Sequence, residues 1–180
     1  MVDSFTSMTK VYEGTMRLGE ETDSYDSDGI IVETRPWRHI TVDQVRLSCR
    51  DFLGPIQQTP PMHSAIKVKG KRLYELARKG EKVERPARSV FVSEFEISPR
   101  SDGGGQDLNF SIVCSKGTYV RSLVHDLGQT LGCGAHMTAL RRTGIGEFSV
   151  DDAWSVEKLA ECMSNSRAEK SGDGRRRRET

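Results

Sequence analysis

Alternation of apolar and polar residues predicts most of the strands in this chain. In residues 108–114 every second side chain is apolar, the pattern of a strand with one buried face: Leu108, Phe110, Ile112 and Cys114. Residues 10–19 show the same period, and the two stretches are therefore predicted as strands. We predict further strands at residues 29–34, 65–68, 89–97 and 147–150. The strands at 10–19 and 29–34 are expected to form a hairpin or to lie side by side.

Helical spacing appears in four other stretches. After a glycine turn at Gly117, apolar residues fall at positions i, i+3, i+4, i+7 and i+11, the stripe of one helix: Val120, Leu123, Val124, Leu127 and Leu131. Thr41 and Gln44 form a capping box that predicts a second helix, ended by Gly54-Pro55. A short helix is predicted at residues 71–79. A last helix from Ser155 is expected to fade into a polar tail.

The length and composition suit one soluble domain. The chain has 180 residues, of which 35% are hydrophobic and 29% charged, and no apolar run approaches the length of a membrane span. Its four cysteines include no CxxC pair, so neither a disulfide framework nor a zinc site is expected. We therefore expect a soluble intracellular protein. Whether it acts in the cytoplasm or in an organelle such as a plastid or mitochondrion stays open.

Charge is unevenly distributed along the chain. The formal net charge is only +1, but residues 61–88 contain nine Lys or Arg against three Glu, whereas the first 34 residues lean acidic. A concentrated basic segment is typical of a surface that binds a polyanion. A merely solvated basic surface explains the same charges. Within this segment Tyr74 has two interpretations, a ring for stacking on a base or a core residue beside Leu73 and Leu76.

Several familiar sites are excluded by spacing. If Gly29 were the sixth position of an EF-hand loop, the twelfth position would be Arg35, which repels calcium. His125, Cys133 and His136 lack the close paired spacing of a zinc site, so no metal is expected. No Ser-His-Asp motif or dinucleotide fingerprint occurs.

The chain closely resembles the TruB family of tRNA pseudouridine synthases in three blocks, in order and spacing: KVYEGTMRLGEETDSYDSDG (10–29), QQTPPMHSAIKVKGKRLYELARKG (57–80) and CSKGTYVRSLVHDLGQTLGCGAHMTALRRTGIGEFSV (114–150). The resemblance implies the α+β pseudouridine synthase fold, a mixed and mostly antiparallel sheet flanked by helices, incomplete at its N-terminus. It also implies isomerisation of a uridine in the T-loop of tRNA, without a metal or organic cofactor.

The resemblance also implies a division of the chain and roles for particular residues. Residues 1–154 correspond to the C-terminal portion of the catalytic domain, with a basic RNA-gripping insertion at 58–88. Residues 155–180 lie outside the resemblance, and their composition predicts a terminal helix and a disordered basic tail. Tyr12 is expected to stack on the flipped uracil, and Arg121 to hold the catalytic carboxylate with Tyr119 beside it. Leu123 and Leu140 are expected to line the base pocket. The expected phosphate contacts are Lys67, Lys69, Lys71, Arg72 and Arg78.

One part of the family pattern is missing from the sequence. The family's catalytic Asp lies upstream of the KVY block, in a segment resembling GxLDPxAxG, and the 180 residues contain no such segment. The available aspartates are unconvincing substitutes by their positions: Asp23, Asp26, Asp28 and Asp126. Three hypotheses follow: an N-terminally truncated synthase that is inactive as this chain alone, an RNA-binding module without chemistry, or a fragment that needs a complementing chain to supply the missing strands and Asp.

Overall fold

The computed structural model describes residues 2–68, 70–81, 83–101 and 104–172 of the chain. The chain divides into two compact units, residues 1–147 and residues 148–180. The boundary falls seven residues before the division expected at residue 154, and each unit is described by itself.

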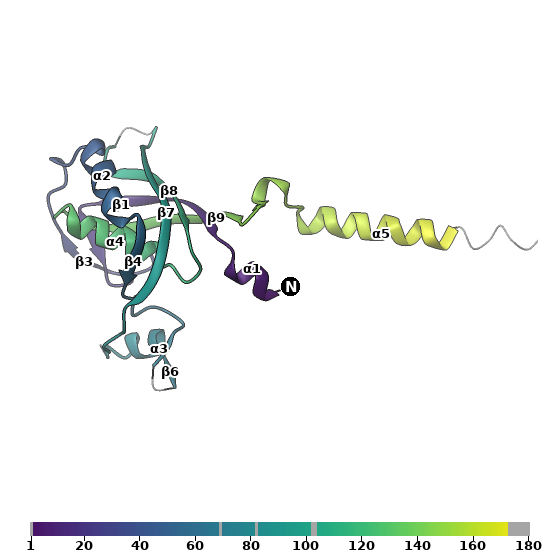
Figure 1. Ribbon diagram of the computed structural model, residues 1–180, viewed down its shortest axis with the longest axis horizontal. Helices are drawn as coiled ribbons and strands as arrows, with labels where there is room; N and C mark the ends of the chain where they lie inside the picture. The colour runs from purple at the N-terminus through teal and green to yellow at the C-terminus, as the bar shows by residue number, and fades with distance from the viewer. Residues whose placement is uncertain (1, 69, 82, 102–103, 173–180) are drawn as a thin grey trace, which may run out of the picture. The chain divides into compact units, whose positions relative to one another are not determined.

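Unit 1 is built on an antiparallel sheet. Its strands, in chain order, are β1 (Lys10–Leu18), β4 (Gly54–Gln58), β7 (Arg88–Pro99), β8 (Asp107–Cys114) and β9 (Ala135–Ile145). They lie in the order β9-β1-β8-β7-β4, and each neighbouring pair is antiparallel. The α+β class with a mostly antiparallel sheet is confirmed. Figure 1 shows β1, β7, β8 and β9 side by side.

The prediction that residues 10–19 and 29–34 pair was wrong. The second stretch forms β3 (Ile31–Thr34), which pairs with β2 (Glu20–Thr22) in a separate two-stranded sheet. The reason is that both edges of β1 are occupied, by β8 and by β9. Gly19, with φ of +85°, turns the chain out of the main sheet immediately after β1.

Two strands of the main sheet were not predicted. Strand β9 is 11 residues long but lies in a stretch with four glycines and two exposed arginines, so its sequence shows no clear alternation. Strand β4 begins at Gly54-Pro55, a pair that predicts only the end of a helix. Proline is tolerated there because β4 is the last strand of the sheet.

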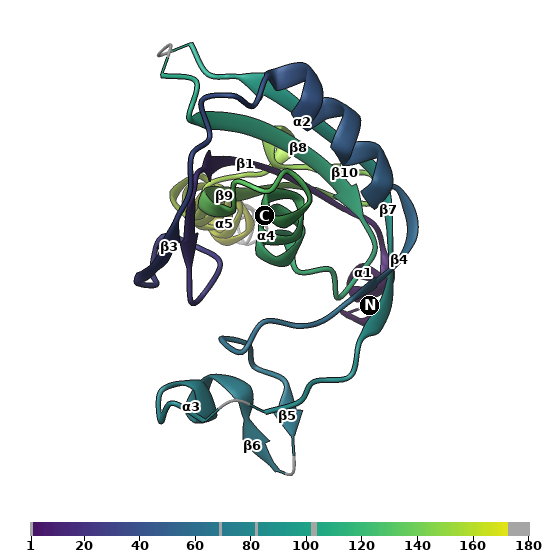
Figure 2. The ribbon, with the colours of Figure 1, turned by 90° about the vertical axis from the view of Figure 1, so that its left-hand side faces the viewer.

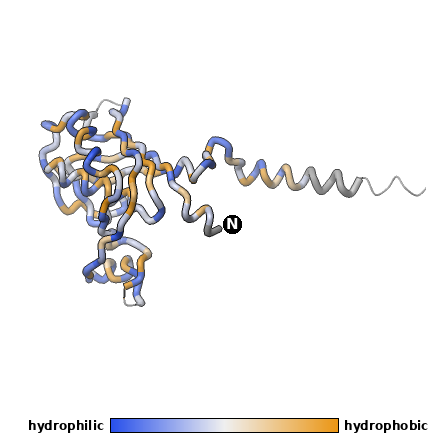
Figure 3. Tube along the Cα trace, viewed as in Figure 1, coloured by the Kyte–Doolittle hydropathy of each residue, from blue (hydrophilic) through white to orange (hydrophobic). Residues whose placement is uncertain are grey.

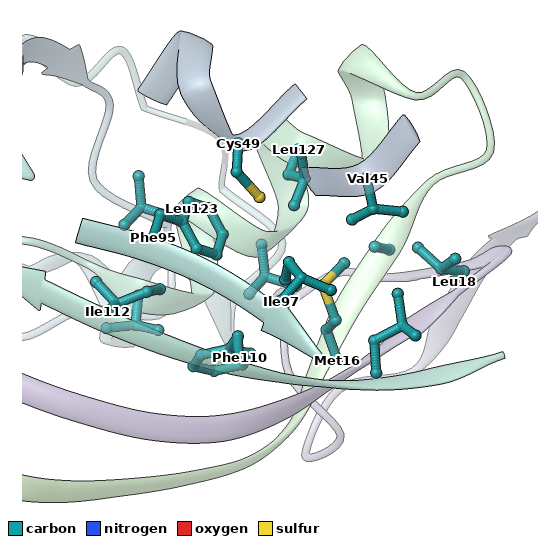
Figure 4. Close-up of a cluster of buried hydrophobic side chains, with 14 of the residues drawn as sticks. Met16, Leu18, Val45, Cys49, Phe95, Ile97, Phe110, Ile112, Leu123 and Leu127 are labelled. Atoms are coloured by element: carbon teal, nitrogen blue, oxygen red, sulfur yellow. The ribbon is translucent and has the colours of Figure 1, made fainter. Parts of the chain in front are cut away.

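Helices cover one face of this sheet and form the core with it. They are α2 (Val42–Cys49), followed by the short helix η1 (Arg50–Phe52), and α4 (Val120–Thr130), which matches its predicted stripe. The capping box of Thr41 and Gln44 is present. Figure 4 shows Val45 and Cys49 of α2, together with Leu123 and Leu127 of α4, above the side chains of the sheet. Leu123 and Leu127 have no exposed surface.

The basic segment projects from the sheet between β4 and β7, and Figure 2 shows it apart from the main sheet. It contains a two-stranded hairpin, β5 (Lys67–Val68) and β6 (Lys71–Arg72), followed by α3 (Leu73–Ala77). Another short helix, α1 (Val2–Ser7), precedes β1. The Nζ of Lys10 donates to backbone carbonyls at the end of this helix, including that of Thr6 at 2.6 Å.

Unit 2 contains β10 (Phe148–Ser149), the short helix η2 (Val150–Asp152) and α5 (Val156–Gly172). The predicted last helix is therefore present, and it continues beyond residue 165, where the sequence was expected to lose helical structure. The rest of the expected tail, residues 173–180, lies outside the described residues. Figure 3 shows hydrophilic and hydrophobic positions interspersed along both units. Among the described residues, no helix is both long and apolar enough to cross a membrane.

Candidate functional site

The start of α4 is fixed by a buried glutamine at the end of β4. After the turn at Gly117, where φ is +81°, Tyr119 takes the N-cap position of the helix. The side chain of Gln58 accepts a hydrogen bond from the Tyr119 N–H at 2.7 Å and donates one to its carbonyl at 3.0 Å. Gln58 is only 2% exposed. This paired contact holds the start of the basic segment against α4. No sequence pattern predicts it beyond the position of Gln58 in the second block.

Arg121 joins two loops that are far apart in sequence. Its Nη1 donates to Oδ2 of Asp26 at 2.7 Å, and its Nη2 donates to the backbone carbonyl of His63. The two charged side chains are mostly buried, with 22% of Arg121 and 16% of Asp26 exposed. Arg121 therefore ties the basic segment and the acidic loop, residues 23–30 between β2 and β3, to α4.

Asp26, an unconvincing catalytic candidate by its position in the sequence, accepts a hydrogen bond from Arg121 in the structure. Its other oxygen, Oδ1, accepts hydrogen bonds from Ser24 Oγ at 2.5 Å and from the Asp28 N–H at 3.2 Å. Both oxygens of this carboxylate are thus engaged in holding the loop and Arg121. This carboxylate therefore links the loop to Arg121.

A cavity of about 650 Å³ lies where these three elements meet. The acidic loop contributes one wall, residues 63–65 with α3 another, and the start of α4 the third. Among its lining residues are Asp26, His63, Tyr74, Arg78, Tyr119 and Arg121. The structure thus brings together four of the residues that the sequence singled out: Tyr74, Arg78, Tyr119 and Arg121.

Tyr74 lies between two arginines on the basic segment. The guanidinium carbons of Arg72 and Arg78 lie 5.8 Å and 5.5 Å from the centre of its ring, within the range of cation–π attraction. Its neighbours Leu73 and Leu76 are buried, whereas Tyr74 is only half-buried and lines the cavity. This geometry favours an accessible ring over a core residue.

The other candidate cations follow the same surface. Lys67, Lys71, Arg72 and Arg78 are exposed. Lys69 lies outside the described residues. The segment thus offers several cations to solvent together with one aromatic ring, an arrangement suited to phosphates and bases.

Tyr12 and Leu140 lie on neighbouring strands and not among the described residues that line the cavity. In the antiparallel register Tyr12 faces Arg142 on β9, and Leu140 faces Gly14, so Tyr12 and Leu140 share one face of the sheet. Leu140 is 43% exposed, whereas Leu123 is fully buried in the core. Leu123 packs α4 against the core, and none of its surface is accessible to a base.

Burial shifts two ionisable groups in the second turn of α4. It raises the pKa of Asp126 to about 6 and lowers the pKa of His125. In both cases removal from water disfavours the charged form. At neutral pH His125 is therefore uncharged.

Comparison with known proteins points to one family. The family model described as TruB family pseudouridylate synthase (N terminal domain) matches residues 1–120, and the one described as tRNA pseudouridylate synthase B C-terminal domain matches residues 121–175. Relatives named tRNA pseudouridine synthase B include those of Opitutus terrae, 48% identical over 86% of this chain, and Aromatoleum aromaticum, 48% identical over 88%. The chain spans 63% and 50% of these relatives, about half to two thirds of their length.

Solved structures support the same fold. The crystal structure of a Cbf5-Nop10-Gar1 complex contains a chain that matches with a TM-score of 0.62 and 27% identity, over 89% of this chain and 37% of the other. A chain in the structure of an H/ACA RNP bound to a substrate RNA containing 2'-deoxyuridine matches with a TM-score of 0.60 at 22% identity, which shows the fold alone.

Proposed function

The chain belongs to the TruB family of pseudouridine synthases, and on that premise we propose that it forms the part of a tRNA pseudouridine synthase that grips the T-loop and carries the active-site arginine. The reaction is the isomerisation of a uridine to pseudouridine. The bond between N1 of the uracil and the ribose breaks, the ring turns, and C5 of the ring bonds to the same ribose carbon. C5 then loses its proton and N1 gains one, so the product is an isomer of the substrate. No metal or organic cofactor takes part.

The single observation that carries this proposal is the junction at Arg121. One guanidinium there contacts the acidic loop and the basic segment, at the edge of a cavity that also contains Tyr74, Arg78 and Tyr119. A base flipped out of an RNA loop needs an aromatic platform and nearby cations for its phosphates. The cavity and the exposed face of the basic segment offer both.

Each residue has a proposed role. Tyr12 stacks on the flipped uracil, with Leu140 beside it on the same face of the sheet. Arg121 orients the catalytic carboxylate, and Tyr119 lies next to it, whereas Leu123 supports the pocket from the core. The phosphate-binding cations are Lys67, Lys69, Lys71, Arg72 and Arg78.

We propose that the 180-residue chain does not turn over by itself, because it contains no segment resembling GxLDPxAxG, and Asp26, the carboxylate that Arg121 holds, also anchors its own loop. Both oxygens of Asp26 accept hydrogen bonds from the protein. Catalysis then needs an Asp from a segment resembling GxLDPxAxG, and a complementing chain could supply it. The engagement of Asp26 also favours the second candidate, an RNA-binding module that acts without chemistry.

Equilibrium binding tests the part that both candidates share. The chain is titrated into a fluorescent T-stem-loop RNA and into a hairpin of equal length with an unrelated loop. We expect tighter binding of the T-stem-loop, a steep fall in affinity with salt, and weaker binding after Tyr12→Ala. Equal affinity for the two hairpins, or an affinity that salt does not change, would contradict the proposal.

A further inference from the structure

The acidic loop meets α4 at two adjacent points. On the helix, Arg121 and His125 are four residues apart and therefore lie on the same face, one turn from each other. On the loop, Asp26 and Tyr25 are neighbours in sequence. Asp26 pairs with Arg121, and the ring of Tyr25 stacks on His125 with 3.8 Å between centroids and 15° between planes. The ion pair and the ring pair form one two-point contact.

The backbone at Tyr25 adopts an unfavourable conformation to make this contact. Its φ is +68°, and among the described residues it is the one residue other than glycine with positive φ. A bulky side chain in the left-handed region is strained and persists only where its surroundings hold it. Three contacts do so: the ring stack on His125, a hydrogen bond of 3.0 Å from the Met137 N–H to the Tyr25 carbonyl, and one of 3.2 Å from the Tyr25 N–H to the Thr22 carbonyl.

His125 contributes the face of its ring and not its polar atoms. Within the described part of the chain its Nδ1 is buried and has no hydrogen-bond partner. The charged groups that act on it are Glu21 and Arg35, whereas Arg85, Asp126 and Glu21 act on Tyr25. Nδ1 forms no hydrogen bond with the acidic loop, residues 23–30, whereas the ring face stacks on Tyr25. The imidazole is well suited as a flat surface for an aromatic ring.

We propose that the Tyr25–His125 stack is a positioning element that holds Asp26 against Arg121. Tyr25 stacks on His125, which lies on the same face of α4 as Arg121. Because Asp26 follows Tyr25 in the chain, the stack holds the Asp26 carboxylate within reach of the Arg121 guanidinium. Its consequence for catalysis rests on the proposed function, because Arg121 is the arginine assigned there to orient the catalytic carboxylate. Tyr25 and His125 thus act through Arg121 and do not touch the substrate.

Four variants separate the stack from other contributions. Tyr25→Gly removes the ring and also relieves the backbone strain, whereas Tyr25→Phe keeps the ring. His125→Leu fills similar volume without an aromatic face, and His125→Phe restores one. The readouts are hydrogen exchange of the Met137 amide and solvent exchange of the Arg121 Nε–H by NMR, with the Ile112 amide of β8 reporting on the core.

We expect Tyr25→Gly and His125→Leu to speed exchange at Met137 and at Arg121 by about 10-fold. The free energy that an aromatic pair contributes corresponds to a change of about that size in the equilibrium constant for local opening. The two Phe variants should retain the slow rates, and Ile112 should stay protected throughout. Should one disruptive variant lose protection at Ile112, the other and its Phe rescue decide the outcome. Unchanged exchange at both positions in the disruptive variants, or fast exchange in His125→Phe with an intact core, would overturn the proposal.

These readouts need no RNA, so they distinguish this inference from the proposed function. If the chain shows no preference for T-stem-loop RNA but exchange responds as expected, the stack positions Arg121 and the assigned function fails. If the chain prefers the T-stem-loop and exchange does not respond, the function stands and the positioning role is refuted.

Discussion

Replacing Asp26 by Asn probes the ion pair that joins the acidic loop to α4. The change preserves size and one oxygen but removes the negative charge that Arg121 contacts at 2.7 Å. Fully exposed ion pairs contribute about 0–1 kcal/mol, and removing one partner of a fully buried pair costs about 3–5 kcal/mol. With 16% and 22% of the side chains exposed, this pair lies between those limits. We expect a loss of about 2 kcal/mol in the free energy of unfolding.

Urea denaturation followed by circular dichroism measures this loss directly. At a typical slope of about 1–3 kcal/mol per molar urea, about 2 kcal/mol moves the midpoint by roughly 1 M. The matched control is Asp28→Asn, an exposed carboxylate in the same loop, which should change stability by less than about 0.5 kcal/mol. A double-mutant cycle with Arg121→Gln assigns the loss to the pair. If Asp26→Asn and Asp28→Asn have the same midpoint, the ion pair does not stabilise the loop.

Three further predictions address packing, pH and RNA contacts. Gly14→Ala should destabilise the fold by about 1–3 kcal/mol, because the added Cβ would lie 2.2 Å from the carbonyl oxygen of Ala139. Thermal or urea melts measure this loss, and an unchanged midpoint would contradict the close packing of β1 against β9 at Gly14. The pKa of Asp126 is raised to about 6, so the folded state favours its protonated form, and stability falls as pH rises from about 4 to 6. Asp126→Asn should therefore raise the free energy of unfolding by roughly 1 kcal/mol at pH 7 and leave it unchanged near pH 3.5. Urea melts at both pH values measure the two differences, and equal gains at both would contradict burial as the cause. Arg78→Glu should weaken T-stem-loop binding about 10-fold and lower the slope of log affinity against log salt concentration by about one. Titrations at several salt concentrations measure both, and Arg50→Glu, an exposed control on η1, should change neither.

The elements with strong periodicity were predictable from sequence. Helix α4 follows from its apolar stripe, and β8 from its alternation, because each buries one face against the same core. Strand β9 was missed because its residues do not alternate between buried and exposed positions, and because glycines lie within it and on both sides of it. What fixes β9 is its long pairing with β1, which no local window contains.

The contacts of the candidate site also join residues far apart in sequence, so local patterns do not predict them. Tyr119 and Arg121 were identified as site residues through the resemblance of the block at residues 114–150 to the TruB family. Their partners Gln58 and Asp26 lie 61 and 95 residues away in sequence, and only the folded chain brings them together. The position of Asp26 in an acidic loop does not predict its contact with Arg121, which the structure places at 2.7 Å.

Tritium release from T-stem-loop RNA labelled at carbon 5 of the uridines tests the central claim most directly, since forming pseudouridine expels that hydrogen. The chain is assayed alone and mixed with a polypeptide that carries the GxLDPxAxG-type segment of a relative, each with and without Arg121→Gln. We predict no release by the chain alone and release by the mixture that depends on Arg121. Release by the 180-residue chain alone, or no release by a mixture that still binds the RNA, would contradict this account.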